Sequence, residues 1–232
     1  MVWVWTALGV VLALFLASLT PAGRDFRRRM MARMYDRTMR RYEARIGDRK
    51  RALFAALSGT VLEIGPGTGA NFEFLPAAVT RWIGVEPNPH MHASLRAAAE
   101  RQGIAAEFRS ATTDAMAVDD ASVDCVLSTL VLCSVPDPTA VARDVERVLR
   151  PGGKFVFIEH VGAPRGSTLR FFQSLVRPFW AYFADGCCPN RDLEQAIRDV
   201  GFASISVERF RIDREAGPAI IAPHIAGVAG KG

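Results

Sequence analysis

The sequence predicts an α/β fold: a mostly parallel, seven-stranded sheet with helices on both faces. Three observations support this prediction. Short apolar runs alternate with helix-like segments from about residue 59 onward, a glycine-rich loop follows the first run, and an acidic residue follows the second. Alternating strands and helices are typical of a doubly wound sheet, because consecutive parallel strands need a crossover connection.

The first strand of this sheet leads into the glycine-rich loop. The apolar run 61–64 predicts a short buried strand, and Gly65, Gly67 and Gly69 follow it. Glycine permits a tight turn and lets the backbone approach a ligand without a Cβ in the way. We expect residues 70–75 to form the first turns of a helix whose free N–H groups face the bound molecule.

The second strand ends in a carboxylate. Residues 82–85 predict an apolar strand, and Glu86 and Pro87 follow it directly. A carboxylate at the tip of the second strand of such a unit can accept hydrogen bonds from both ribose hydroxyls of a nucleoside. We therefore expect Glu86 and Pro87 to belong to a cofactor site.

The spacing of the glycines distinguishes between two ligands. A dinucleotide fold needs G-x-G-x-x-G, with the helix N-terminus facing a pyrophosphate. This chain has G-x-G-x-G, with Glu63 two positions before the first glycine. That pattern is typical of the Rossmann-like class I methyltransferases, which bind S-adenosylmethionine. Glu63 would repel a pyrophosphate and suits the methionine ammonium group, so the sequence predicts S-adenosylmethionine as the cofactor.

The next elements extend the cofactor site. An alanine-rich helix is predicted over 90–102, and a third strand over 104–108. Asp114 comes after that strand and is the candidate acceptor for the adenine amino group; the alternative is a solvated loop carboxylate. The fourth strand, 122–128, leads to Thr129 at the carboxyl ends of the strands, where open α/β sheets bind ligands.

The predicted domain, 59–232, is completed by two helices, a tight Arg-Pro-Gly-Gly turn, a fifth strand and an antiparallel closing pair of strands. In chain order we expect them over 138–149 (helix), 150–153 (turn), 154–160 (strand), 191–200 (helix), 202–210 (strand) and 220–228 (strand).

Residues 1–23 are predicted to anchor the chain in a membrane. Residues 1–20 carry no charged side chain, and about 20 apolar residues suffice to cross a bilayer as a helix. Trp3 and Trp5 lie at one end, where aromatic rings favour the membrane interface. Basic residues follow the apolar segment, whereas a cleaved signal peptide has them before it. We therefore expect a retained anchor, either spanning or inserted as a shallow hairpin, with the catalytic domain facing the cytoplasm.

Residues 24–58 are predicted to form a basic amphipathic helical segment. Residues 24–51 hold twelve Arg or Lys and four Asp or Glu, whereas the remaining chain is mildly acidic. Five apolar or aromatic side chains recur at helical spacing: Met31, Tyr35, Met39, Tyr42 and Ile46. This stripe either lies on an anionic membrane, which residues 1–51 would then contact, or packs on the domain. The acidic body does not suggest a nucleic-acid partner.

Residues 161–190 interrupt the alternation with a strongly apolar stretch. An insertion after the fifth strand lies on the cofactor side of the sheet, so it is expected to cover the acceptor pocket. Its apolar character indicates a lipophilic substrate or contact with the membrane. The alternative is ordinary packing of one helix on the sheet.

The cysteines give no sign of a metal site. The chain has Cys125, Cys133, Cys187 and Cys188, and their spacing is not typical of metal ligands. Reduced thiols facing the cytosol are the expected state, so no metal is predicted.

Several short motifs resemble those of one family. In chain order they are Leu130–Val135 (Leu-Val-Leu-Cys-Ser-Val), Val148–Gly153, Glu159–Val161, Asp185–Cys187 and Pro223–Ile225. They stand in the order found in the membrane-associated thiol S-methyltransferases, and the similarity runs from about Val61 to the C-terminus. One departure is Pro66, where the family usually has Cys. The resemblance implies methyl transfer from S-adenosylmethionine to small, lipophilic alkyl thiols.

Three residues are candidate bases for such a reaction. The thiolate is the nucleophile, and a free thiol with a pKa of about 8.5 is only slightly ionised at neutral pH. His160, at the end of the fifth predicted strand, is the first candidate, and Asp185 and His224 follow. Each has a structural alternative: a strand cap for His160, a turn or helix cap for Asp185, and a buried structural histidine for His224.

Other functions remain open from the sequence. The same scaffold would suit N-methylation of a phospholipid head group or C-methylation of a quinone ring, and both agree with a membrane anchor. A membrane-bound scaffold that binds S-adenosylmethionine without turnover is the non-enzymatic alternative. The sequence does not name the acceptor or the oligomeric state.

Overall fold

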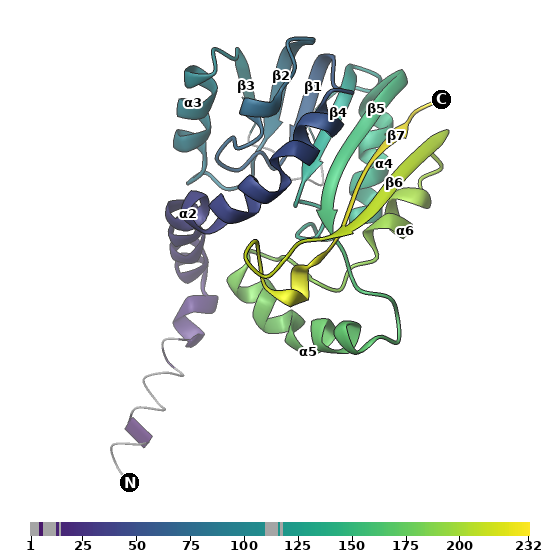
Figure 1. Cartoon of the computed structure of the whole chain (residues 1–232). Coiled ribbons are helices and arrows are strands. Elements are labelled where there is room, and N and C mark those ends of the chain that lie inside the picture. Colours follow the sequence, from purple (N-terminus) through teal and green to yellow (C-terminus); the bar gives the residue numbers. More distant parts are fainter. Residues whose placement is uncertain (1–4, 7–12, 14, 110–115, 117) are drawn as a thin grey trace.

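One sheet of seven strands forms the centre of the computed structural model, which describes residues 5, 6, 13, 15–109, 116 and 118–232 (Figure 1). The strands are β1 (Gly59–Ile64), β2 (Val79–Val85), β3 (Ala106–Arg109), β4 (Val123–Thr129), β5 (Leu149–His160), β6 (Ser204–Arg211) and β7 (Pro223–Gly230). Their order in the sheet is β3-β2-β1-β4-β5-β7-β6. Strands β1 to β5 run parallel, and β7 runs antiparallel to β5 and β6. The predicted sheet and its antiparallel closing pair are confirmed.

Helices cover both faces of the sheet. They are α2 (Pro21–Phe54), α3 (His92–Arg101), α4 (Pro138–Val148), α5 (Thr168–Phe183) and α6 (Leu193–Arg198), with the one-turn helices η1 (Phe72–Phe74) and η2 (Ala219–Ile221). Helices α4 and α6 pack on one face, and α3 and the C-terminal end of α2 pack on the other (Figure 1). The result is a three-layer arrangement in which the sheet is the middle layer.

Two apolar layers hold the helices on the sheet. Val141, Val145 and Val148 share one face of α4 and are buried against the sheet. On the other side Phe54 of α2 packs in the same cluster as Trp82 of β2. Because β1 and β4 bury side chains on both faces, the loops at their carboxyl ends start from fixed positions.

Two predicted elements are wrong in detail. Residues 70–75 do not begin a long helix; only η1 forms, and Leu75 is extended (φ −69°, ψ 127°) because the following Pro76 disfavours a helical residue before it. Residues 150–153 are not a separate turn, since β5 already begins at Leu149. A register shift against β4 and the left-handed Gly152 (φ 76°) take up the bend there.

The predicted anchor, 1–23, lies partly outside the described residues, which include 5, 6, 13 and 15–23 of that range. Pro21 occupies the first turn of α2, and the Thr20 hydroxyl caps the helix by accepting from the N–H of Gly23 (3.2 Å). Within the described part of the chain, no helix is both long and apolar enough to cross a membrane. The predicted transmembrane helix is therefore not found among those residues.

The apolar stripe of α2 faces the domain over its C-terminal half. Tyr42 and Ile46 are buried, and Met39 packs beside them against Ile212 and Ala222. This part of α2 therefore packs on the domain, which is one of the two predicted arrangements. The contact brings the helix across the end of the sheet where the parallel strands finish (Figure 1).

Two glycine-to-alanine substitutions test this packing. Gly227→Ala in β7 places a Cβ 2.3 Å from the carbonyl oxygen of Ser206 and 2.7 Å from the Phe157 ring. We expect it to lower the free energy of unfolding by about 1–3 kcal/mol. Gly47→Ala in α2 places a Cβ at ordinary contact distance from the Phe74 ring (3.6 Å) and the Arg51 guanidinium (3.9 Å), and should raise the free energy of unfolding by about 0.5–1 kcal/mol. Urea unfolding measures both, and equal effects would contradict the packing described.

Candidate active site

The glycine loop after β1 has the backbone that its sequence predicts. Gly65, Gly67 and Gly69 have φ angles of 59°, 59° and 88°, in the left-handed region that favours glycine. A Cβ at Gly65 would lie 2.7 Å from the Cγ2 atom of Val131. The loop after β4 therefore closes directly on the glycine loop, and contact of these glycines with a cofactor stays a prediction.

Glu86 at the tip of β2 points back at the glycine loop. Its carboxylate is buried and accepts hydrogen bonds from the backbone N–H groups of Gly67 (2.9 Å) and Asn88 (2.7 Å). Burial raises the pKa of Glu86, and the two N–H donors oppose that rise. The ribose contact predicted for Glu86 and Pro87 stays a prediction, as does the adenine contact of Asp114, which falls outside the described residues.

Glu63 lies beneath the loop and already has two donors. Its oxygens accept from the Asn71 side-chain amide (2.7 Å) and from Nε1 of Trp82 (2.8 Å), and burial raises its pKa to about 7. The same Asn71 amide donates to the Thr129 hydroxyl (3.2 Å). Asn71 thus joins two predicted cofactor residues. The sequence analysis missed it, although it is the first polar residue after the glycine triplet.

Helix α2 covers the cofactor side of the loop. Asp36 accepts from the Thr68 hydroxyl (2.6 Å), and Arg28 donates to the carbonyl oxygen of Pro87 (2.7 Å). Tyr35 lies beside Gly67, 3.7 Å from where a Cβ would be, and burial raises the pKa of its hydroxyl. These contacts of α2 could not be predicted from the sequence, because periodicity shows which residues share a helix face but not what they contact.

A pocket of about 840 Å³ lies next to this part of α2. It opens between α2, the end of β5, α5 and the segment before β7, and its volume is in the range typical of small-molecule sites. The lining residues are Arg37–Tyr42, Leu130, His160, Trp180, Arg214–Pro218, Ile221 and His224. Leu130 follows β4, so the pocket adjoins the loop that closes on Gly65.

Two predicted base candidates, His160 and His224, meet on the wall of this pocket. Their ring centroids are 6.2 Å apart, and Tyr42 lies 5.6 Å from His224. All three side chains are buried. Within the described part of the protein, Nδ1 of His160, Nε2 of His224 and the Tyr42 hydroxyl have no hydrogen-bond partner. Buried polar atoms of this kind are costly unless something else binds them, so they mark a site for a ligand.

His224 is held neutral. Its Nδ1 lies 3.0 Å from the carbonyl oxygen of Ala222, which fixes the proton on Nδ1 and leaves Nε2 as an acceptor. Burial lowers its pKa to about 4. A neutral imidazole with a free acceptor nitrogen can receive an S–H, O–H or N–H donor from a ligand in the pocket.

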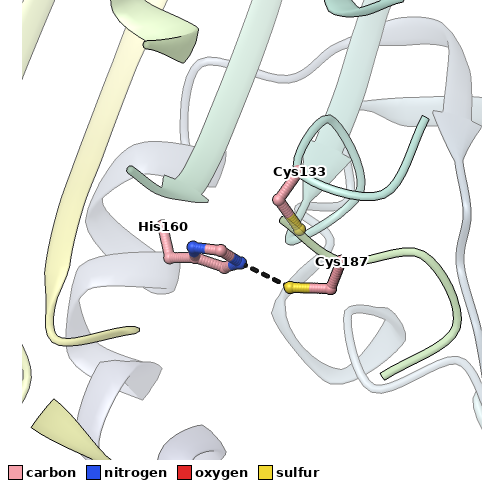
Figure 2. A group of neighbouring side chains, drawn as sticks. All are labelled: Cys133, His160 and Cys187. Atoms are coloured by element: carbon pink, nitrogen blue, oxygen red, sulfur yellow. Dashed lines mark hydrogen bonds between the residues drawn. The ribbon is translucent and has the colours of Figure 1, made fainter. Parts of the chain in front are cut away.

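His160 also belongs to a second group of side chains. Its Nε2 lies 2.9 Å from the Cys187 sulfur, and the Cys133 sulfur lies close to both (Figure 2). Nε1 of Trp180 donates to Cys187 (3.3 Å). The neighbouring Cys133 thiol and the hydrogen-bonded His160 lower the pKa of Cys187 to about 4. The sequence analysis missed this cluster, because its members come from three separate segments.

Asp185, the third base candidate, forms part of a strained turn. Its φ is 46°, that of Gly186 is 91°, and its carboxylate pairs with Arg28 of α2 (3.4 Å). It is not among the described residues that line the pocket. The contact observed for its carboxylate is the ion pair with Arg28, so the capping alternative and a catalytic role both stay predictions.

Comparison with known proteins extends this description. A family model described as a methyltransferase domain matches residues 62–157. Human thiol S-methyltransferase TMT1B is 36% identical over 213 residues, which cover 87% of this chain and 84% of that protein. Human thiol S-methyltransferase TMT1A is 37% identical over 201 residues, which cover 82% and 81%.

Solved structures agree with the fold. A geranyl diphosphate methyltransferase aligns with a TM-score of 0.64 at 16% identity, covering 80% of this chain and 78% of that one. A Haemonchus contortus phosphoethanolamine N-methyltransferase aligns with a TM-score of 0.65 at 17% identity, covering 89% and 60%. At these identities the likeness concerns the fold alone.

Glu86→Ala tests the cofactor site. Hydrogen bonds to a charged group are worth about 1.5–3 kcal/mol, so we expect the Kd for S-adenosylmethionine to rise at least about 10-fold. Glu107→Ala is the matched control, because Glu107 lies within the neighbouring strand β3 and pairs with Arg81 and Arg109 instead. Calorimetry measures both, and an unchanged Kd for the Glu86 variant would contradict this placement.

Acid is expected to destabilise the protein through His224. Burial lowers the pKa of His224 to about 4 in the fold, against about 6.5 for a free histidine, so the unfolded chain takes up a proton first as the pH falls. The free energy of unfolding keeps the full contribution of His224 above about pH 6.5. Between about pH 6.5 and pH 4 it falls by about 3 kcal/mol as the unfolded chain takes up the proton. Urea unfolding of His224→Phe should show a flatter pH profile, and a profile parallel to that of the unaltered protein would contradict the assignment.

Proposed function

Since the chain belongs to the thiol S-methyltransferase family of class I, S-adenosylmethionine-dependent methyltransferases, we propose that it methylates small, lipophilic alkyl thiols at a membrane. The observation that carries the choice of acceptor is the pocket beside the glycine loop. Its walls supply two imidazoles, one aromatic hydroxyl and apolar surface from Leu130 and Ile221.

Charge at the pocket supports a thiol over an amine. Arg37, Arg40, Arg41 and Arg214 line it, against one carboxylate, Glu215. A positive field stabilises a thiolate and lowers the pKa of a bound thiol, whereas it disfavours the cationic form of an amine acceptor. Tyr42 and Trp180 also line the pocket and would suit a cation, so the argument for a thiol is the excess of arginines over the single carboxylate.

The residues of the pocket prepare the thiol for reaction. The bound cofactor supplies an activated methyl group on a sulfonium, and the acceptor sulfur must approach that carbon as a thiolate. Nδ1 of His160 and Nε2 of His224 are the two nitrogens on the wall that can accept the thiol proton. Apolar walls exclude water and hold the alkyl chain, so the protein contributes mainly orientation and desolvation.

Membrane association is the second part of the proposal. Five large side chains gather on one face of α5, and each is between 49% and 75% exposed: Phe171, Phe172, Leu175, Phe179 and Phe183. Phe26, Met30 and Met34 of the arginine-rich α2 are exposed as well. An exposed apolar face beside basic residues suits an anionic membrane surface. With 1–23 as the anchor, the domain would face the cytoplasm and receive lipophilic thiols from the bilayer.

Transfer of labelled methyl groups tests the acceptor. Full-length protein in detergent would receive a small alkyl thiol, a phosphatidylethanolamine and a quinol in parallel, with Glu86→Ala as the inactive control. We expect label in an extractable methyl thioether, lost in the control. Label in the lipid or quinol instead would refute the thiol assignment, and binding of S-adenosylmethionine without transfer to any acceptor would indicate a scaffold.

A further inference from the structure

The cysteine–histidine cluster is not explained by the proposed function. Cys133 lies on the loop after β4, His160 ends β5, and Cys187 lies in the turn after α5 (Figure 2). One ligand atom from each residue, namely two sulfurs and an imidazole nitrogen, lies within 4.8 Å of the other two. All three side chains are buried.

We propose that Cys133, His160 and Cys187 bind one zinc ion, whose fourth coordination position receives the thiolate of the acceptor. This inference rests on the proposed thiol acceptor. It assigns to the protein a metal that activates the same substrate.

The donor set suits zinc. Thiolate and imidazole ligands select zinc over the hard cations, which prefer oxygen. Zn–S distances of about 2.3 Å and Zn–N distances of about 2.0–2.1 Å place tetrahedral ligand atoms roughly 3.5–3.8 Å apart. The 2.9 Å contact between His160 and Cys187 must therefore open by roughly 0.6 Å. A change of that size needs only small side-chain rotations.

The backbone holds the two cysteines toward each other. The N–H of Cys188 donates to the carbonyl oxygen of Cys133 (2.9 Å), which joins the two loops. Leu130, three residues before Cys133, and Asp185, two before Cys187, both have left-handed backbones (φ 58° and 46°). Such strain in residues other than glycine persists where the surrounding structure requires it, often at functional sites.

Three protein ligands leave one position open. Structural zinc sites are closed by four protein ligands, whereas catalytic sites have three and keep a position for water or substrate. Cys188 does not complete the set, because its thiol donates to the carbonyl oxygen of Gly186 (3.4 Å). His160 and Trp180, which both contact Cys187, also line the acceptor pocket. The open position is therefore next to the place where the thiol is expected to bind.

The thiol loses its proton to solvent on binding, and its sulfur keeps the electron pair and coordinates zinc. With its Nε2 bound to zinc, His160 carries a proton on Nδ1 and is a donor, so Nδ1 of His160 can accept the thiol proton only in the metal-free protein. The sulfur forms a bond to the methyl carbon while the bond from that carbon to the sulfonium sulfur breaks, and that sulfur takes the electron pair. The neutral thioether is a weaker zinc ligand than a thiolate and leaves.

Metal analysis of the full-length protein, purified in detergent without chelators, tests the site. We expect about one zinc per chain, lost in Cys133→Ser and Cys187→Ser. Cys188→Ser and Cys125→Ser are matched controls, because both thiols are buried but lie outside the cluster. An unchanged Kd for S-adenosylmethionine would show that the zinc-free variants are folded. Absence of zinc from the unaltered protein, with no uptake on addition, would refute the site.

Cobalt substitution tests the open position. Co²⁺ at two cysteine thiolates and a histidine should give sulfur-to-cobalt charge-transfer bands and the visible bands of a tetrahedral site, and a small alkyl thiol should shift them. Bands that do not respond to thiol would refute the substrate position.

Activity separates the failure of this inference from failure of the proposed function. If chelator-treated, zinc-free protein methylates the thiol at an undiminished rate, the zinc proposal is wrong and the thiol assignment stands. If cobalt bands respond to thiol but no thioether forms, the metal site stands and the proposed acceptor is wrong.

Discussion

The arrangement of the site depends on one buried carboxylate. Glu159 near the end of β5 is fully buried, and a single oxygen accepts from the Ser128 hydroxyl (2.7 Å) and the N–H groups of Val131 (3.1 Å) and Leu132 (3.2 Å). Burial raises the pKa of Glu159, and these donors oppose the rise. The loop held in this way supplies a pocket wall, the contact with Gly65 and one cysteine of the cluster, so its conformation governs all three.

The two halves of the site meet at that loop. On one side lie the glycine loop, Glu86 and the buried link from Glu63 through Asn71 to Thr129. On the other side lie the pocket and the cysteine–histidine cluster. Only a few residues after β4 separate them, so a cofactor methyl group and a bound acceptor can approach each other without a large movement of the sheet.

The parts of this fold that follow from neighbouring residues were predictable. An apolar strand, alternating glycines and a terminal Glu86 each depend on a few adjacent positions. The helix after the loop was wrongly predicted because Pro76 was not weighed against the general pattern of such folds. The cluster of Cys133, His160 and Cys187 was missed because its members lie 27 residues apart in each step. Neither local spacing nor periodicity predicts a tertiary contact between residues so far apart in the sequence.

The position of α2 has a consequence for any shortened form of the protein. A shortened form could begin beyond the uncharged segment 1–20. However, Arg28 donates a hydrogen bond to the carbonyl oxygen of Pro87 and pairs with Asp185, and Asp36 accepts a hydrogen bond from the Thr68 hydroxyl. A truncation that begins beyond Asp36 would remove one side of the cofactor site together with the hydrophobic segment. Only shortened forms that begin before Arg28 retain these contacts.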